Sequence, residues 1–244
     1  MNEVIQRRKL YQEVLDRLME RIRTGAILPG AQLPSERELM EEYGVGRPAV
    51  REALQALERS GIVEIAHGER ARVVVPTADR LVAQLAGGAM HLLRTQPQTL
   101  EHLKDARLFL EMGTARMAAE RASEEQVAAL RLSIARHRAS MVNLSEFIER
   151  DMAFHRDIAA ISGNPIFPAI VEAMFSWASE YYRTLVRAPG AEELTLEEHT
   201  RIVDAIAAHD SDGAAEAMRA HLTRANTLYQ HLVRDELDAP STRA

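Results

Sequence analysis

The sequence contains no cysteine, which excludes disulfide bonds and thiolate metal sites. Any metal ion must therefore be held by histidine, aspartate or glutamate. Long hydrophobic runs are also missing, because no segment approaches the roughly 20 apolar residues of a membrane-spanning helix. The first residues lack the apolar core of a signal peptide. We expect a cytoplasmic protein with no membrane partner, and its 244 residues are enough for two domains.

Excess positive charge, a common mark of nucleic-acid-binding proteins, is missing as well, since the net charge is −6. The charge is unevenly distributed along the chain. Residues 1–75 contain 12 Lys and Arg against 12 Asp and Glu, so all of the excess acid lies after residue 75. If the N-terminal part binds DNA, the attraction must come from locally clustered arginines rather than from bulk charge.

The first 75 residues follow the order of a winged helix-turn-helix. Ser35 and Glu38 form a capping box at the start of a short helix that ends at Tyr43, and a tight turn then leads into a further helix. Two β-branched segments flank His67 and Gly68 and predict a hairpin wing. We expect helices over 8–24, 36–43 and 47–59, and strands over 62–65 and 71–75.

Arginines occupy the positions from which such a fold contacts DNA. The third helix is the recognition helix, and it begins with Arg47, Pro48 and, one turn later, Arg51. Arginine can hold guanine O6 and N7, or a phosphate, with two parallel hydrogen bonds. Arg37 is placed to reach the backbone, and His67-Gly68 to enter the minor groove. A single arginine is often only a solvated charge, but the complete order of elements favours DNA binding.

Three segments of this region resemble the GntR family of bacterial regulators: Leu33–Leu39, Gly44–Leu54 and Leu57–Gly61. In that family the residues matching Arg37, Arg47, Arg51 and Gly68 contact DNA. The resemblance therefore implies that these four positions bind an operator.

The chain after Pro76 shows helical periodicity and no strand signal, so we expect an all-α bundle. The predicted caps are Thr99, Ser123, Ser145 and Asn164. The helices are predicted over 78–93, 99–121, 123–141, 145–162, 164–186, 192–209 and 211–235. The fold class is mostly α, with strands only in the wing.

Four polar residues lie on the apolar, inward faces of three of these helices: Asp151, His155, His199 and His221. An unpaired polar group in a bundle interior costs several kcal/mol. Together they form an N₃O set suited to a divalent ion, most often zinc, with nickel and manganese as alternatives. One inward histidine is more often hydrogen-bonded within the core, but four such residues favour a metal site. Histidines 67, 91, 102, 137, 209 and 231 show no comparable grouping.

This ligand pattern resembles the FCD sensor domain of the FadR-type branch of the GntR family, in which an Asp, a His four residues later and two further His bind metal. The resemblance covers residues 78–235 and disfavours the acyl-CoA-responsive members, which lack the set. We expect a DNA-binding domain over 1–75, a linker and connecting helix over 76–98, an effector and metal-binding domain over 99–237, and a disordered tail over 238–244.

Two residues are candidates for binding an acidic effector. Arg107 lies on an inward stripe, and its planar fork suits a carboxylate. An ion pair with Glu111, four residues later, is an equally good interpretation. Asn164 lies beside the metal set, but it also has a structural role as a helix cap.

Within the family, the segments Gly46–Pro48, Gly68–Val73 and Gly163–Phe167 look similar to those of the sialic-acid-responsive repressors. This implies repression of a carbon-catabolism operon by a homodimer, with N-acetylneuraminate as the effector. Lactate, citrate, gluconate and a hexuronate are the alternative effectors. A metal-dependent hydrolase fused to a DNA anchor is a remote alternative, because no carboxylate is placed by spacing as a general base. A constitutive architectural DNA binder would leave the buried ligand set unexplained.

Overall fold

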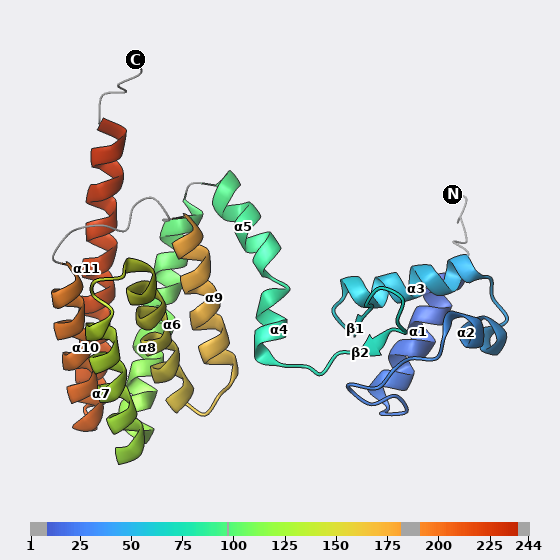
Figure 1. Cartoon of the computed structure of the whole chain (residues 1–244), viewed down its shortest axis with the longest axis horizontal. Coiled ribbons are helices and arrows are strands. Elements are labelled where there is room, and N and C mark those ends of the chain that lie inside the picture. Colours follow the sequence, from blue (N-terminus) through green and yellow to red (C-terminus); the bar gives the residue numbers. More distant parts are fainter. Residues whose placement is uncertain (1–8, 97, 182–190, 239–244) are drawn as a thin grey trace, which may run out of the picture. The chain divides into compact units, whose positions relative to one another are not determined.

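The computed structural model describes residues 9–96, 98–181 and 191–238 (Figure 1). The chain divides into two compact units, and the boundary in the sequence lies between Thr77 and Ala78. Each unit contains its own hydrophobic core. The two units are therefore described separately, as the DNA-binding unit and the helical unit.

The DNA-binding unit packs three helices against a two-stranded wing. Its elements are α1 (Leu10–Arg23), α2 (Glu36–Tyr43), α3 (Arg47–Arg59), β1 (Val63–Glu64) and β2 (Arg72–Val73). The predicted capping box starts α2, since the Ser35 side chain accepts from the Glu38 N–H and Glu38 accepts from the Ser35 N–H. Gly44 ends α2 in the left-handed region at φ +64°, which favours glycine. The order of the winged helix-turn-helix is confirmed.

The strands of the wing are shorter than the predicted 62–65 and 71–75. Val63 pairs with Val73, and Glu64 with Arg72, in antiparallel register. The other edge of the second segment pairs with the chain that precedes α2: the Val73 N–H donates to the Ala31 carbonyl at 2.8 Å, and the Leu33 N–H to the Ala71 carbonyl at 2.7 Å. Backbone groups of the wing are thus satisfied by a loop from another part of the sequence, which strand propensity alone does not reveal.

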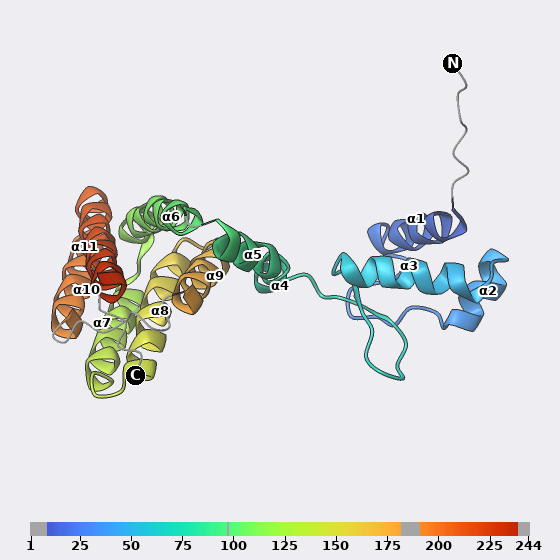
Figure 2. The same cartoon turned by 90° about the horizontal axis from the view of Figure 1, so that it is seen from above.

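The helical unit is an all-α bundle, as predicted. It contains α4 (Ala78–Ala83), α5 (Ala86–Thr95), α6 (Thr99–Arg121), α7 (Glu124–Ala139), α8 (Leu144–Ile161), α9 (Ile166–Tyr181), α10 (Ala191–Ala207) and α11 (Ser211–Asp238). Helix α6 packs against α11, α8, α9 and α10, and Figure 2 shows it between α11 and α5. The core includes Ala115, Ala118, Leu130, Phe154, Ile158, Leu196, Ile202, Ile206, Met218 and Leu222.

Some predicted boundaries in this unit differ from the structure. Residues 78–93 were expected to form one helix, but a turn at Gln84 and Leu85 separates α4 from α5, and both helices pack against α9. The cap at Ser123 is confirmed, since its side chain accepts from the Gln126 N–H. The caps at Thr99 and Ser145 are wrong. Thr99 is already the first residue of α6, and Gln98 before it makes no capping hydrogen bond through its side chain. Asn143, rather than Ser145, caps α8 by accepting from the Glu146 N–H.

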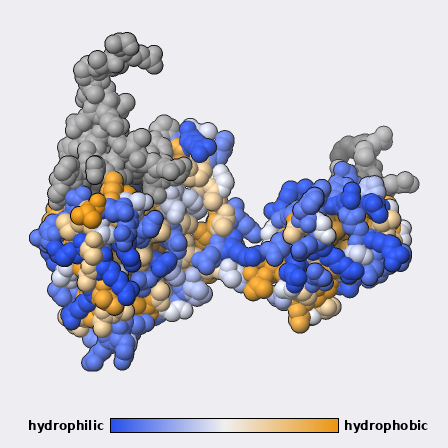
Figure 3. Space-filling view, viewed as in Figure 1, coloured by the Kyte–Doolittle hydropathy of each residue, from blue (hydrophilic) through white to orange (hydrophobic). Residues whose placement is uncertain are grey.

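Two of the predicted segments extend beyond the described residues. Helix α11 continues to Asp238, and the rest of the predicted disordered tail lies outside the described residues, as does the predicted end of the helix over 164–186. The face of the molecule in Figure 3 is mostly hydrophilic, with small hydrophobic patches between the charges. Within the described ranges no helix has the length and apolar character to cross a membrane.

Candidate DNA-binding surface and metal centre

The arginines predicted to bind DNA lie on the surface of the DNA-binding unit. Arg47 begins α3 and Arg51 follows one turn later, with side chains 60% and 58% exposed. Arg37 lies near the start of α2 and is 80% exposed. Pro48 is exposed in the first turn of α3, where a missing N–H leaves no helical hydrogen bond unmade. The opposite face of α3 is buried in the core, so the Arg47 and Arg51 side chains face away from the core.

Glu36 links the two arginines of the recognition helix, a role that no pattern in the sequence indicates. Its Oε1 accepts a 2.8 Å hydrogen bond from Arg51 Nε, and its Oε2 lies 3.7 Å from Arg47 Nε. Glu36 is the first residue of α2, where a carboxylate also interacts favourably with the helix dipole. The bond to Nε orients the Arg51 side chain, which is 58% exposed.

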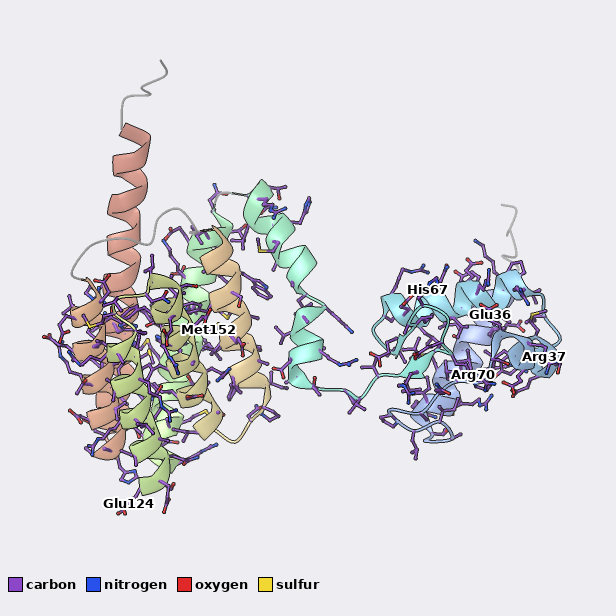
Figure 4. All side chains as sticks on the ribbon, viewed as in Figure 1. Glu36, Arg37, His67, Arg70, Glu124 and Met152 are labelled. Carbon is purple, nitrogen blue, oxygen red and sulfur yellow. The ribbon has the colours of Figure 1, made fainter. Side chains whose placement is uncertain are left out.

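The wing projects beside α3. Gly68 has φ +77°, a conformation that favours glycine, and both it and His67 are exposed. Arg70 pairs with Glu38 at 3.4 Å, which ties the wing to α2. A groove of about 720 Å³ lies between α3, the start of α2 and the wing residues 65–71. Figure 4 labels Glu36, Arg37, His67 and Arg70 on this unit.

The four predicted metal ligands come together in the helical unit. Asp151 and His155 lie on α8, His199 on α10 and His221 on α11, and one ligand atom from each lies within 4.8 Å of the others. The Nε2 atoms of His155 and His221 are 3.3 Å apart, and His199 Nε2 lies 3.3 Å from Asp151 Oδ1. The three imidazoles are at most 3% exposed. The clustering of the four residues matches the prediction.

The donor atoms of this cluster fit a metal ion. Among the described residues, Asp151 Oδ1 and both ring nitrogens of His199 have no hydrogen-bond partner. Burial lowers the pKa of His221, and it lowers that of His199 well below its usual range, with the neighbouring histidines adding to the effect. Neutral imidazoles are the form that binds metal, and a cation would satisfy buried lone pairs that otherwise cost free energy.

Two buried carboxylates contact His155 and His221 on the side of each ring that faces away from the cluster centre. Glu198 on α10 accepts a 2.8 Å hydrogen bond from His221 Nδ1, and Glu111 on α6 contacts His155 Nδ1 directly. A proton held at Nδ1 leaves the Nε2 lone pair directed to the cluster centre. Carboxylates behind ligating histidines are typical of metal sites, where they fix the tautomer and the ring orientation.

Each carboxylate is held in turn by an arginine. Arg224 donates to both oxygens of Glu198 at 2.6 Å, and Arg107 Nε donates to Glu111 Oε1 at 2.5 Å. Burial alone would raise the pKa of Glu111, but Arg107 and then His155 outweigh it and lower the pKa to about 2. The ion pair that was one interpretation of Arg107 is therefore present, and its guanidinium also lies 4.8 Å from the centre of the Phe175 ring.

The remaining histidines were expected to show no grouping comparable to the ligand set. His137 is not among the clustered ligand residues, but it lies beside them. His137 on α7 is completely buried, with its ring centre 4.0 Å from that of Phe147 and 5.4 Å from that of His199. Burial lowers its pKa. Helix α7 contains none of the four predicted metal ligands. The spacing of residues along this helix therefore gives no sign that His137 lies near them.

Asn164, the second candidate for the effector, is half-buried before α9. Its side-chain oxygen accepts a 3.0 Å hydrogen bond from the Ile166 N–H, which is the capping role. Binding of an effector by Asn164 stays a prediction.

Comparisons with known proteins identify both units. Residues 10–73 match the bacterial regulatory proteins of the gntR family, and residues 102–224 match the FCD domain. The chain belongs to the GntR family. Family members are transcriptional regulators, so this chain is a regulator and not the hydrolase considered from sequence.

Several relatives carry the name HTH-type transcriptional repressor NanR. The Enterobacter sp. protein is 44% identical over 88% of this chain and 84% of its own length, and the Escherichia coli K12 protein is 43% identical over 88% and 82%. The Cronobacter sakazakii protein is 41% identical over 93% and 87%. Among solved structures, a GntR protein of Streptococcus agalactiae has a TM-score of 0.66 at 24% identity, covering 89% of this chain and 99% of its own, and it supports the fold.

Proposed function

We propose that this GntR regulator is a cytoplasmic repressor that leaves its operator when an acidic sugar, N-acetylneuraminate, binds at a metal centre in the helical unit. The observation that carries the proposal is the buried cluster of Asp151, His155, His199 and His221, with a carboxylate behind two of its histidines. The similarity to repressors named NanR, at 41–44% identity, supports the choice of sialic acid among the sugar acids.

The four clustered residues would hold the ion, and zinc suits their N₃O donor set best. A bound divalent cation would supply a positive centre with room for a carboxylate oxygen. Among the ligands, Asp151 has the most exposed side chain, at 19%, so an effector would enter on its side. The arginines behind Glu111 and Glu198 keep these carboxylates charged and fixed, and the carboxylates orient the histidines. The ligand set is therefore preorganised before the ion arrives.

DNA binding belongs to the other unit. From α3, Arg47 and Arg51 reach base edges or phosphates of the DNA. Arg37 reaches the DNA backbone, and the wing tip at His67-Gly68 approaches the minor groove. A homodimer would present two such surfaces to two half-sites. The effector changes DNA affinity only as far as it binds the DNA-competent and released states with different affinities.

The test uses a labelled DNA fragment selected from a random library for tight binding to the zinc-loaded protein. Fluorescence anisotropy then measures release as N-acetylneuraminate, lactate, citrate, gluconate or glucuronate is added. We expect N-acetylneuraminate to release the DNA and Arg51→Ala to bind poorly without any effector. If only another acid releases the DNA, that acid and not N-acetylneuraminate is the effector. Undiminished DNA binding by Arg51→Ala would contradict the assignment of Arg51 as a DNA contact.

A further inference from the structure

His137 combines complete burial with an absence of hydrogen bonds. It lies on α7, 0% exposed, and neither ring nitrogen has a hydrogen-bond partner among the described residues. The Phe147 backbone lies near the ring and raises the pKa of His137, against the larger lowering effect of burial. Buried polar groups without partners are rare in proteins, so this imidazole calls for a partner that the described residues do not supply.

Packing alone does not explain a histidine at this position. The ring lies against Phe147 at 4.0 Å between centres, a contact that another aromatic ring would make as well. A phenylalanine would avoid the cost of burying two polar nitrogens, which is about 1–3 kcal/mol for each unsatisfied group. The nitrogens of His137 are therefore better explained by a ligand than by the core.

The position of His137 relates it to the metal centre but does not make it a ligand. Its ring centre is 5.4 Å from that of His199, so it lies beside the cluster. It is not part of the group whose ligand atoms lie within 4.8 Å of one another. The four ligands come from α8, α10 and α11, whereas His137 approaches from α7. It therefore lies beside the metal centre without being one of its ligands.

We propose that His137 forms a hydrogen bond with the effector. Its partner is a hydroxyl group of a polyhydroxylated sugar acid whose carboxylate binds the metal ion. A neutral imidazole offers one N–H donor and one acceptor, which matches a hydroxyl group that both accepts and donates. This inference rests on the proposed function, and it adds a residue that selects hydroxylated acids over simple carboxylates. Lactate and citrate offer fewer hydroxyl groups and would gain less from this contact.

The experiment compares zinc-loaded wild type with His137→Phe and His137→Gln. Isothermal titration calorimetry measures N-acetylneuraminate, gluconate and glucuronate binding, and competition with a chromogenic chelator measures zinc affinity. We expect His137→Phe to bind the sugar acid roughly ten- to a hundredfold more weakly, the loss of one hydrogen bond to a polar or charged partner. Zinc affinity should stay within about twofold, and His137→Gln should recover part of the binding. If the Phe variant does not fold, His137→Leu takes its place.

The control is His209→Asn, which removes an exposed imidazole that bonds to the Ala119 carbonyl and takes no part in the described ring contacts of the cluster. Asparagine tolerates its positive φ of 54°. Equal sugar-acid affinity in wild type and His137→Phe overturns the role of His137 alone. A parallel loss of zinc affinity makes it a metal-site residue and overturns the proposal too. Failure of zinc-loaded wild type to bind any of the three acids overturns the effector assignment together with it.

Discussion

Replacing Glu111 with glutamine keeps the size of a buried side chain but removes a charge that two partners contact. Arg107 donates to one of its carboxylate oxygens at 2.5 Å, and His155 Nδ1 contacts the other. The side chain is 1% exposed, so water does not screen these interactions. The substitution therefore leaves the Arg107 guanidinium partly buried without its counter-charge.

The size of the effect follows from the pKa of Glu111. A fall from the ordinary 4.5 to about 2 corresponds to about 3 kcal/mol, at about 1.4 kcal/mol for each pH unit. Because the folded-state pKa is lowered, this stabilisation is complete above pH 4.5 and is lost as the pH falls toward 2. We expect Glu111→Gln to lower the free energy of unfolding of the metal-free helical unit by about 3 kcal/mol at pH 7.

Urea titration followed by tryptophan fluorescence measures this directly. The only tryptophan, Trp177, packs beside Leu93 and Leu100 in the helical unit, so its signal reports that unit alone. The control is Glu216→Gln on α11, which removes an exposed carboxylate bonded to Arg219 and should leave the unfolding free energy nearly unchanged. The difference between wild type and Glu111→Gln should shrink from pH 5 to pH 2.5. A difference that is absent at pH 7, or constant with pH, would refute the reasoning.

Three further predictions concern other parts of the molecule. Glu36→Gln should raise the affinity for non-specific DNA roughly threefold, because it removes a negative charge that would repel DNA phosphate. It should also reduce discrimination between DNA sequences roughly threefold, because Arg51 loses its fixed orientation. Competition anisotropy at constant salt measures both effects. Phe154→Ala should cost about 3–5 kcal/mol of stability in urea unfolding, because Phe154 is 0% exposed and stacks on His199. Zinc at a hundredfold excess over its Kd should stabilise the wild-type helical unit by about 2.7 kcal/mol in the same assay and leave His199→Ala unchanged; equal stabilisation of both would contradict the ligand assignment.

The DNA-binding unit was predictable because its signals are local. The capping box at Ser35, the helix end at Gly44 and the wing turn at Gly68 each depend on residues close in sequence, and the structure has them where they were expected. The length of the strands was not predictable in this way. It depends on hydrogen bonds to residues 30–33, about forty positions earlier in the chain.

The candidate metal centre was also predictable only where the signal is local. Its four ligands were predicted because each is a polar residue on an apolar helical stripe, and helical periodicity reveals that within one segment. Glu198 and His137 were missed because their roles depend on a partner on another helix, and Glu111 was considered only as the local partner of Arg107. Acidic residues are common on helix surfaces, so their burial here shows only when the helices are packed together.

The central claim is that the effector binds through a metal ion held by the buried Asp and His cluster. The most direct test is calorimetric titration of N-acetylneuraminate into zinc-loaded protein and into the same preparation stripped with a chelator. The account predicts saturable binding to the loaded protein, none to the stripped protein, and recovery when zinc is returned. Equal binding to both preparations, or no binding to the zinc-loaded protein, would contradict it.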